Sequence, residues 1–179
     1  MTQQGVSPDA RIAVLGAAHR PTAQAVILRG LQREFVALGQ AAGASRRGVE
    51  LARALAMLSY RGARGLDTRF ADPSGAVAYV HARAAQLVDS NPFQAEQLFA
   101  RFGPALDNFR VPPQAIRNPL LLVSFADDYL APKHLMTEFA SLLPNCRDHI
   151  EVATVHGHDG FILNTASYGP QLKQFLEDV

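Results

Sequence analysis

The chain has 179 residues, of which 48% are hydrophobic and 18% charged, and its formal net charge is +1. A chain of this length can bury a core, and this composition is typical of a folded globular domain rather than a disordered segment. The near-neutral charge gives no reason to expect nucleic acid or an anionic membrane as a partner.

The cysteine content and the hydropathy pattern predict the environment. Cys146 is the single cysteine, so a disulfide within the chain is excluded and a reducing compartment is favoured. It stands in a polar stretch predicted as a turn, where we expect a bystander rather than a nucleophile. No apolar run reaches transmembrane length, and residues 1–8 lack the charged and apolar regions of a signal peptide. We therefore expect a cytoplasmic protein without membrane contact.

Apolar spacing predicts one strand, then a long helical segment, then alternating strands and helices. Residues 11–18 form an apolar run that predicts a buried strand. Helical spacing follows over residues 24–42, 49–60 and 77–88, and in a fourth helix opened by Pro92, which Gly103-Pro104 ends or kinks. The pattern then predicts a strand over 120–125, a helix over 132–143, a strand over 149–155 and a last helix over 161–179. This order predicts an α/β fold with a helical insert between strands of one sheet.

Acidic and histidine residues follow two of the predicted strands. Asp128 comes shortly after residues 120–125, and His158 comes shortly after residues 149–155. Loops at strand ends carry much of the chemistry of α/β proteins. An acid after one strand and a histidine after the next is the acid and base half of a Ser-His-Asp triad in an α/β-hydrolase.

Neighbouring residues offer alternatives for these roles. Asp127 could be the acid or could cap the following turn, but the spacing to Leu130 and Pro132 favours Asp128. His156 is expected to be a loop residue. A metal at His156 and His158 would need a third ligand that the sequence does not place, so no metal site is predicted.

Several segments resemble the homoserine O-acyltransferases, which are α/β-hydrolase-fold enzymes of methionine biosynthesis. Residues 51–61 and 67–70 are similar to the family's cap, and residues 128–132 to its acid loop. Residues 157–163 are similar to its histidine loop, and residues 17–21 with 31–33 to the segment after its nucleophile-bearing helix. The resemblance runs in order over nearly the whole chain, but it covers only the C-terminal half of the family. It implies a partial α/β-hydrolase domain over residues 1–179, with a cap insert at 22–110 and sheet-core parts at 11–18 and 117–179.

The resemblance also implies roles for individual residues. Asp128 would orient His158, and His158 would be the general base. Asp159 would face the substrate amino group, although it could instead cap the last helix. Arg33 would lie near the substrate carboxylate, although an arginine on a helix is often simply solvated. The implied reaction transfers an acetyl or succinyl group from acyl-CoA to L-homoserine through an acyl-serine, with acyl-CoA as a substrate and no bound cofactor. Cap helices pair subunits in this family, which implies a homo-oligomer.

The sequence differs from the family in its nucleophile. No Gly-x-Ser-x-Gly elbow occurs in the sequence, and the nearest candidate, Ser124, stands inside a predicted strand. We therefore expect a family member that lacks its N-terminal half through truncation, gene splitting or an alternative start, and that is inactive alone. The alternatives are a non-catalytic remnant or interaction module, and a serine hydrolase, against which Asp159 and the cap argue. The sequence does not distinguish acetyl from succinyl donors, or homoserine from serine acceptors.

Overall fold

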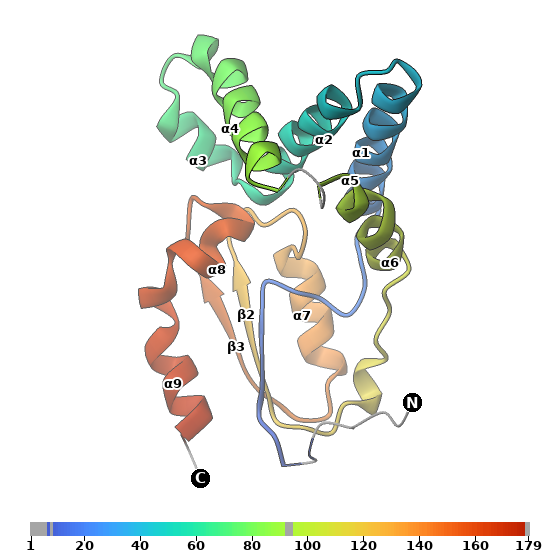
Figure 1. The fold of residues 1–179 in the computed structure, drawn as a ribbon. Coiled ribbons are helices and arrows are strands. Elements are labelled where there is room, and N and C mark those ends of the chain that lie inside the picture. Colours follow the sequence, from blue (N-terminus) through green and yellow to red (C-terminus); the bar gives the residue numbers. More distant parts are fainter. Residues whose placement is uncertain (1–6, 8, 92–94, 178–179) are drawn as a thin grey trace.

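A parallel three-stranded sheet forms the lower half of the molecule in the computed structural model, which describes residues 7, 9–91 and 95–177 (Figure 1). The strands are β1 (Ile12–Leu15), β2 (Leu120–Phe125) and β3 (Cys146–Val152), in the order β1-β2-β3. Val14 is in register with Leu122, and Leu122 with His149. The predicted α/β fold is confirmed, and so is the strand over residues 120–125.

Helices cover both faces of the sheet, which explains why every residue of β2 is buried. Alternate residues of a strand point to opposite faces. Leu120 and Leu122 pack against α7 (Lys133–Leu142), whereas Leu121 and Val123 pack against the layer that contains α9 (Gly169–Glu177) (Figure 1). A strand enclosed in this way needs the continuous apolar run that the sequence shows.

The segment between β1 and β2 is helical and lies beyond the carboxyl ends of the strands (Figure 1). Its α-helices are α1 (Ala23–Ala41), α2 (Ser45–Tyr60), α3 (Ala63–Arg69), α4 (Ala76–Ser90), α5 (Ala95–Gln97) and α6 (Gly103–Asp107). The turn Leu98–Phe102 is π-helical. A second apolar core holds this layer together, formed by Val36, Val49, Ala52, Val88 and Phe99. We call residues 23–107 the cap.

Several predicted boundaries differ from the structure. β3 begins at Cys146 and ends at Val152, because its partner β2 runs from Leu120 to Phe125 and the ladder ends with it. The expected turn at Cys146 was therefore wrong. β1 is shorter than predicted, since its pairing with β2 covers only Ile12–Leu15.

Two helical predictions also need correction. The single last helix is instead α8 (Gly160–Leu163), a 3-10 turn (Thr165–Ser167) and α9. Helix α3 was missed because Gly62 and Gly65 suggest a loop, whereas they allow close packing on the sheet side of the cap. The predicted opening of a helix at Pro92 lies outside the described residues. No helix in the described ranges combines the length and the apolar character needed to cross a membrane.

Candidate active site

Asp128 and His158 meet at the carboxyl end of the sheet. Asp128 lies in the loop after β2, residues 126–132 (the acid loop), and His158 lies in the loop after β3, residues 153–160 (the histidine loop). The Nδ1 atom of His158 is 2.9 Å from Oδ2 of Asp128. The Asp128 side chain is 0% exposed, whereas that of His158 is 22% exposed. The acid is thus enclosed, and the imidazole reaches toward solvent.

The acid loop holds the Asp128 carboxylate in place. Its Oδ1 accepts hydrogen bonds from the backbone N–H groups of Leu130 at 2.8 Å and Ala131 at 2.9 Å. Because Oδ1 is occupied, Oδ2 is directed to His158. A carboxylate at Nδ1 favours the tautomer with the proton on that atom, which leaves Nε2 as a base.

The imidazole of His158 is packed by its neighbours. Gly16 follows β1 with a φ of +57°, and a Cβ built there would lie 3.4 Å from Cε1 and Nδ1 of the ring. The ring centroid of Phe161 is 5.4 Å from that of His158. A side chain at position 16 would need both a strained backbone and a shift of the ring.

Asp127 is tied to the cap. It adopts a φ of 59°, and its Oδ2 accepts a hydrogen bond from Nε of Arg64 at 2.8 Å. Arg64 also donates from Nη2 to the carbonyl of Thr154 at 3.4 Å. Of the two adjacent acids, Asp128 therefore makes the contact to His158, and Asp127 connects the acid loop to α3.

Asp159 forms an ion pair with Arg61, the residue directly after α2. Nε of Arg61 lies 2.9 Å from Oδ2 of Asp159. The N–H is not well aligned with that oxygen, since Arg61 Nε is also a buried atom without a hydrogen bond, so the contact is one of charge. Burial raises the pKa of Asp159, while Arg61, His158 and His156 oppose that rise. Asp159 precedes α8 but makes no side-chain capping bond there.

Arg33 is paired within the cap. Its Nη2 is 2.8 Å from Oδ2 of Asp107, and Arg29 Nε is 2.6 Å from Oδ1 of the same carboxylate. A carboxylate ligand at Arg33 would therefore compete with Asp107. A hollow of about 260 Å³ lies between the end of β1, α1 and the acid loop, with Gly16, Arg29 and Leu130 in its lining.

Ser124 is paired with a different histidine. Its hydroxyl is 2.8 Å from Nε2 of His149, and its residue is 2% exposed on β2. His156 donates its backbone N–H to Thr154 Oγ1 at 3.0 Å. Within the described ranges, no group of three or more acidic, histidine or cysteine side chains could hold a metal ion.

Arg61, Arg64 and Gly16 are neighbours of the site that were not predicted from the sequence. The only sign of them in the sequence is a pair of glycines, Gly62 and Gly65, which lie close to Arg61 and Arg64. Glycines allow two backbones to come close together, and the structure shows Gly62 and Gly65 packed against the backbone of the histidine loop.

Comparisons with known proteins found relatives of this chain. No protein-family profile matches the chain. It is 34% identical over 163 residues to the homoserine O-succinyltransferase of Xanthomonas campestris pv. campestris, covering 84% of this chain and 42% of that relative. It is 31% identical over 147 residues to the homoserine O-acetyltransferase of Mycobacterium tuberculosis, covering 72% of this chain and 39% of that relative.

Solved structures show the same fold. The homoserine O-acetyltransferase of Staphylococcus aureus superposes with a TM-score of 0.74 at 24% identity, over 93% of this chain and 51% of that one. Esterase E22 superposes with a TM-score of 0.81 at 13% identity, over 93% of this chain and 54% of that one.

The chain resembles the C-terminal part of homoserine O-acyltransferases. Its fold is a partial α/β-hydrolase fold, as the resemblance predicted. It spans about half or less of the length of the relatives that it matches.

Proposed function

We propose that this chain is the C-terminal part of a homoserine O-acyltransferase and supplies the acid and base of a Ser-His-Asp mechanism. The observation that carries the proposal is the 2.9 Å contact between His158 Nδ1 and the enclosed Asp128 carboxylate. The two residues stand after neighbouring parallel strands, where α/β-hydrolases place them. The 34% identity to a homoserine O-succinyltransferase supports the reaction class.

The nucleophilic serine comes from residues outside these 179. Its oxygen attacks the thioester carbonyl of acyl-CoA while His158 Nε2 takes the hydroxyl proton. That proton then passes to the departing CoA thiolate, which leaves an acyl-serine. The hydroxyl of homoserine attacks this ester, gives its proton to His158, and receives the acyl group as the proton returns to the serine oxygen. Asp128 stabilises the imidazolium in both steps.

The sheet offers a place for the complementary segment. In the described part of the chain β1 is an edge strand, and all of its residues are only half-buried, unlike those of β2. An edge strand presents unpaired N–H and C=O groups to another strand. We infer that the segment bearing the serine pairs along β1 and brings its nucleophile beside His158.

We assign substrate recognition to Asp159 and Arg33. Asp159 faces the ammonium group of L-homoserine, and Arg33 lies toward its carboxylate in competition with Asp107. The acyl donor is acetyl-CoA or succinyl-CoA, and both acyl groups occur in the names of the relatives. The product would enter methionine biosynthesis, in the cytoplasm.

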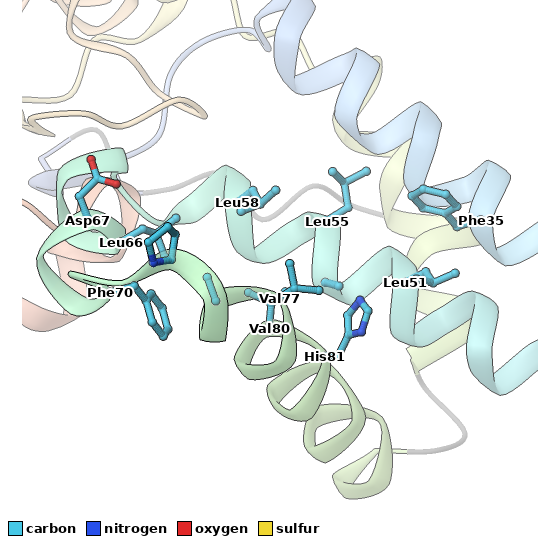
Figure 2. A pocket seen from close by; sticks show the side chains of 13 residues that line it. Phe35, Leu51, Leu55, Leu58, Leu66, Asp67, Phe70, Val77, Val80 and His81 are labelled. Carbon is cyan, nitrogen blue, oxygen red and sulfur yellow. The ribbon is translucent and has the colours of Figure 1, made fainter.

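A second copy is proposed as the partner of the cap. An apolar pocket of about 370 Å³ lies in the cap, lined by residues of α1, α2, α3, α4 and the segment between α3 and α4 (Figure 2). Leu58 and Val77 in this lining are 50% and 66% exposed. A second cap would bury these side chains and form a homo-oligomer.

A serine hydrolase is the second candidate, because esterase E22 shares the fold with a TM-score of 0.81. A hydrolase would use the same acid and base but pass the acyl group to water. A non-catalytic remnant that retains the fold is the remaining alternative. Dependence of turnover on homoserine separates the transferase from both.

Thiol release from acetyl-CoA and succinyl-CoA tests the proposal. The 179-residue chain alone should release no thiol with homoserine, since it has no elbow serine. Addition of the part of the Xanthomonas relative that precedes the matched segment should restore homoserine-dependent release. His158→Ala in the mixture should lower it about 10²-fold or more, as expected for a lost general base.

Each outcome discriminates between the candidates. Robust homoserine-dependent turnover by the chain alone would show that the nucleophile lies within it. Release that is independent of homoserine would favour the hydrolase. A well-folded chain that no N-terminal segment activates would favour the remnant.

A further inference from the structure

The corner of the cap nearest the site, residues 60–65, packs its backbone directly against the histidine loop. A Cβ built on Gly62 would lie 2.7 Å from the carbonyl oxygen of Val155 and 2.9 Å from the nitrogen of Gly157. A Cβ on Gly157, which has a φ of +60°, would lie 2.6 Å from the nitrogen of Gly62. Real Cβ atoms do not approach this closely, so glycine is required on both sides. The corner and the histidine loop therefore fix each other's backbone position.

Arg61 stands in this corner and contacts one oxygen of Asp159. The pair joins Nε to Oδ2 at 2.9 Å, and the side chains are 27% and 18% exposed. This contact occupies Oδ2, whereas no ion pair or hydrogen bond within the described residues uses Oδ1. The backbone packing at Gly62 fixes the position of the neighbouring Arg61 backbone relative to the histidine loop.

Several charges act on Asp159 from the surrounding elements. Arg61 comes from the end of α2, and His156 and His158 come from the loop of Asp159 itself. Burial, together with the charge of Asp159, raises the pKa of Tyr60. Arg61 is the permanently charged group among those that stabilise the carboxylate.

We propose that Arg61 is a positioning residue, which holds the Asp159 carboxylate by Oδ2 so that Oδ1 binds the ammonium group of the acceptor amino acid. The inference rests on the proposed function and adds a residue to it. A primary ammonium group is a compact charge with donors that match a free carboxylate oxygen. Arg61 thereby connects the cap to recognition of the amine. It also gives the partly buried Asp159 carboxylate a counter-charge, which offsets the cost of its desolvation.

Removal of Arg61 has a defined electrostatic consequence. Burial already raises the pKa of Asp159, and Arg61 is the first of the groups that oppose the rise. In Arg61→Gln the pKa of Asp159 should rise further, so the ionised form that binds an ammonium group is lost at a higher pH. Arg61→Lys keeps a positive charge and should restore most of the effect.

The first experiment follows the Asp159 carboxyl carbon by NMR during a pH titration of the 179-residue chain. The pKa of Asp159 should rise in Arg61→Gln and return toward its original value in Arg61→Lys. Arg64→Gln is the matched control, because Arg64 lies in the same corner but pairs with Asp127. It should leave the Asp159 titration unchanged.

The second experiment measures ligand binding to the same proteins by NMR shifts. L-Homoserine should bind about tenfold more weakly to Arg61→Gln than to the unmodified chain, since a charge-assisted contact is disturbed. 4-Hydroxybutanoate lacks the ammonium group and should not discriminate between them.

An unchanged Asp159 pKa in Arg61→Gln, or equal homoserine affinity, would overturn the inference. The titration needs no ligand, so it decides the electrostatic role of Arg61 separately. If the unmodified chain binds no homoserine while Arg61 still controls the titration, the proposed acceptor is wrong instead.

Discussion

Asp128 uses both carboxylate oxygens, one to order its own loop and one to hold His158. The two uses can be separated by substitution. Asn retains an oxygen for the N–H groups of Leu130 and Ala131, whereas Ala removes the acceptor of a buried donor and of a partly buried one.

We expect Asp128→Ala to lower the free energy of unfolding by roughly 1–4 kcal/mol, because an unsatisfied buried group costs about 1–3 kcal/mol and the Leu130 N–H is only partly buried. Asp128→Asn should lose clearly less. Urea denaturation at pH 7 measures both values. Equal losses would show that the Oδ1 contacts do not stabilise the loop.

His149 predicts a pH dependence of stability. Burial lowers its pKa from 6.5, against the opposing charges of Glu151 and Asp148. The native state therefore favours the neutral ring, while the unfolded chain takes up a proton as the pH falls through 6.5. The contribution of neutral His149 is complete above that pH and is lost as the pH falls toward the lower native-state pKa.

His149→Gln should flatten this part of the profile. Glutamine can still form a hydrogen bond with Ser124 but does not titrate. Urea denaturation between pH 7.5 and pH 5 should show a smaller loss of stability in the variant than in the unmodified chain. The same loss in both would exclude His149 as a source of the pH dependence.

At the scale of elements, the contact of α3 with the histidine loop depends on glycine. A Cβ on Gly65 would overlap the carbonyl oxygen of Val155. Gly75, at the start of α4, has a φ of −85°, and a Cβ there would meet nothing within 4 Å. The two positions form a matched pair for the same substitution.

We expect Gly65→Ala to destabilise the chain by about 1–3 kcal/mol, as overpacking commonly does. Gly75→Ala should be neutral or stabilising by up to about 1 kcal/mol, because alanine restricts the unfolded chain. Thermal and urea unfolding measure the difference. Similar values would mean that the cap corner moves freely on the loop.

At the scale of the whole molecule, the cap pocket predicts self-association. Val77 lines the pocket and is 66% exposed, and Ile162 on α8 is 61% exposed but lies outside it. Sedimentation velocity should show an oligomer for the unmodified chain and for Ile162→Lys, and a monomer for Val77→Lys. Both substitutions place a charge at an exposed site, so neither should prevent folding. A monomeric unmodified chain would contradict the second copy as partner.

Sequence alone located the parts of the molecule that local patterns encode. The apolar run at 120–125, interrupted only by Ser124, predicted β2 with its observed bounds, because a strand enclosed on both faces is mostly apolar. The polar residues directly after such runs identified the loops of Asp128 and His158. Similarity of those loops to a known family added the expected chemistry.

Tertiary structure decided which of these residues meet. Pairing with β2 determined the ends of β3. The polar residues Arg147 and Asp148 near its start do not follow the apolar pattern of a strand. Spacing favoured Asp128 over Asp127, but the contacts of these two acids with His158 and Arg64 required the chain to be folded. The same is true of the pairing of Arg33 with Asp107 and of Arg61 with Asp159. Ion pairs between distant residues leave no periodic trace in a sequence. They depend on backbone approach and on burial, which only the assembled sheet and cap establish.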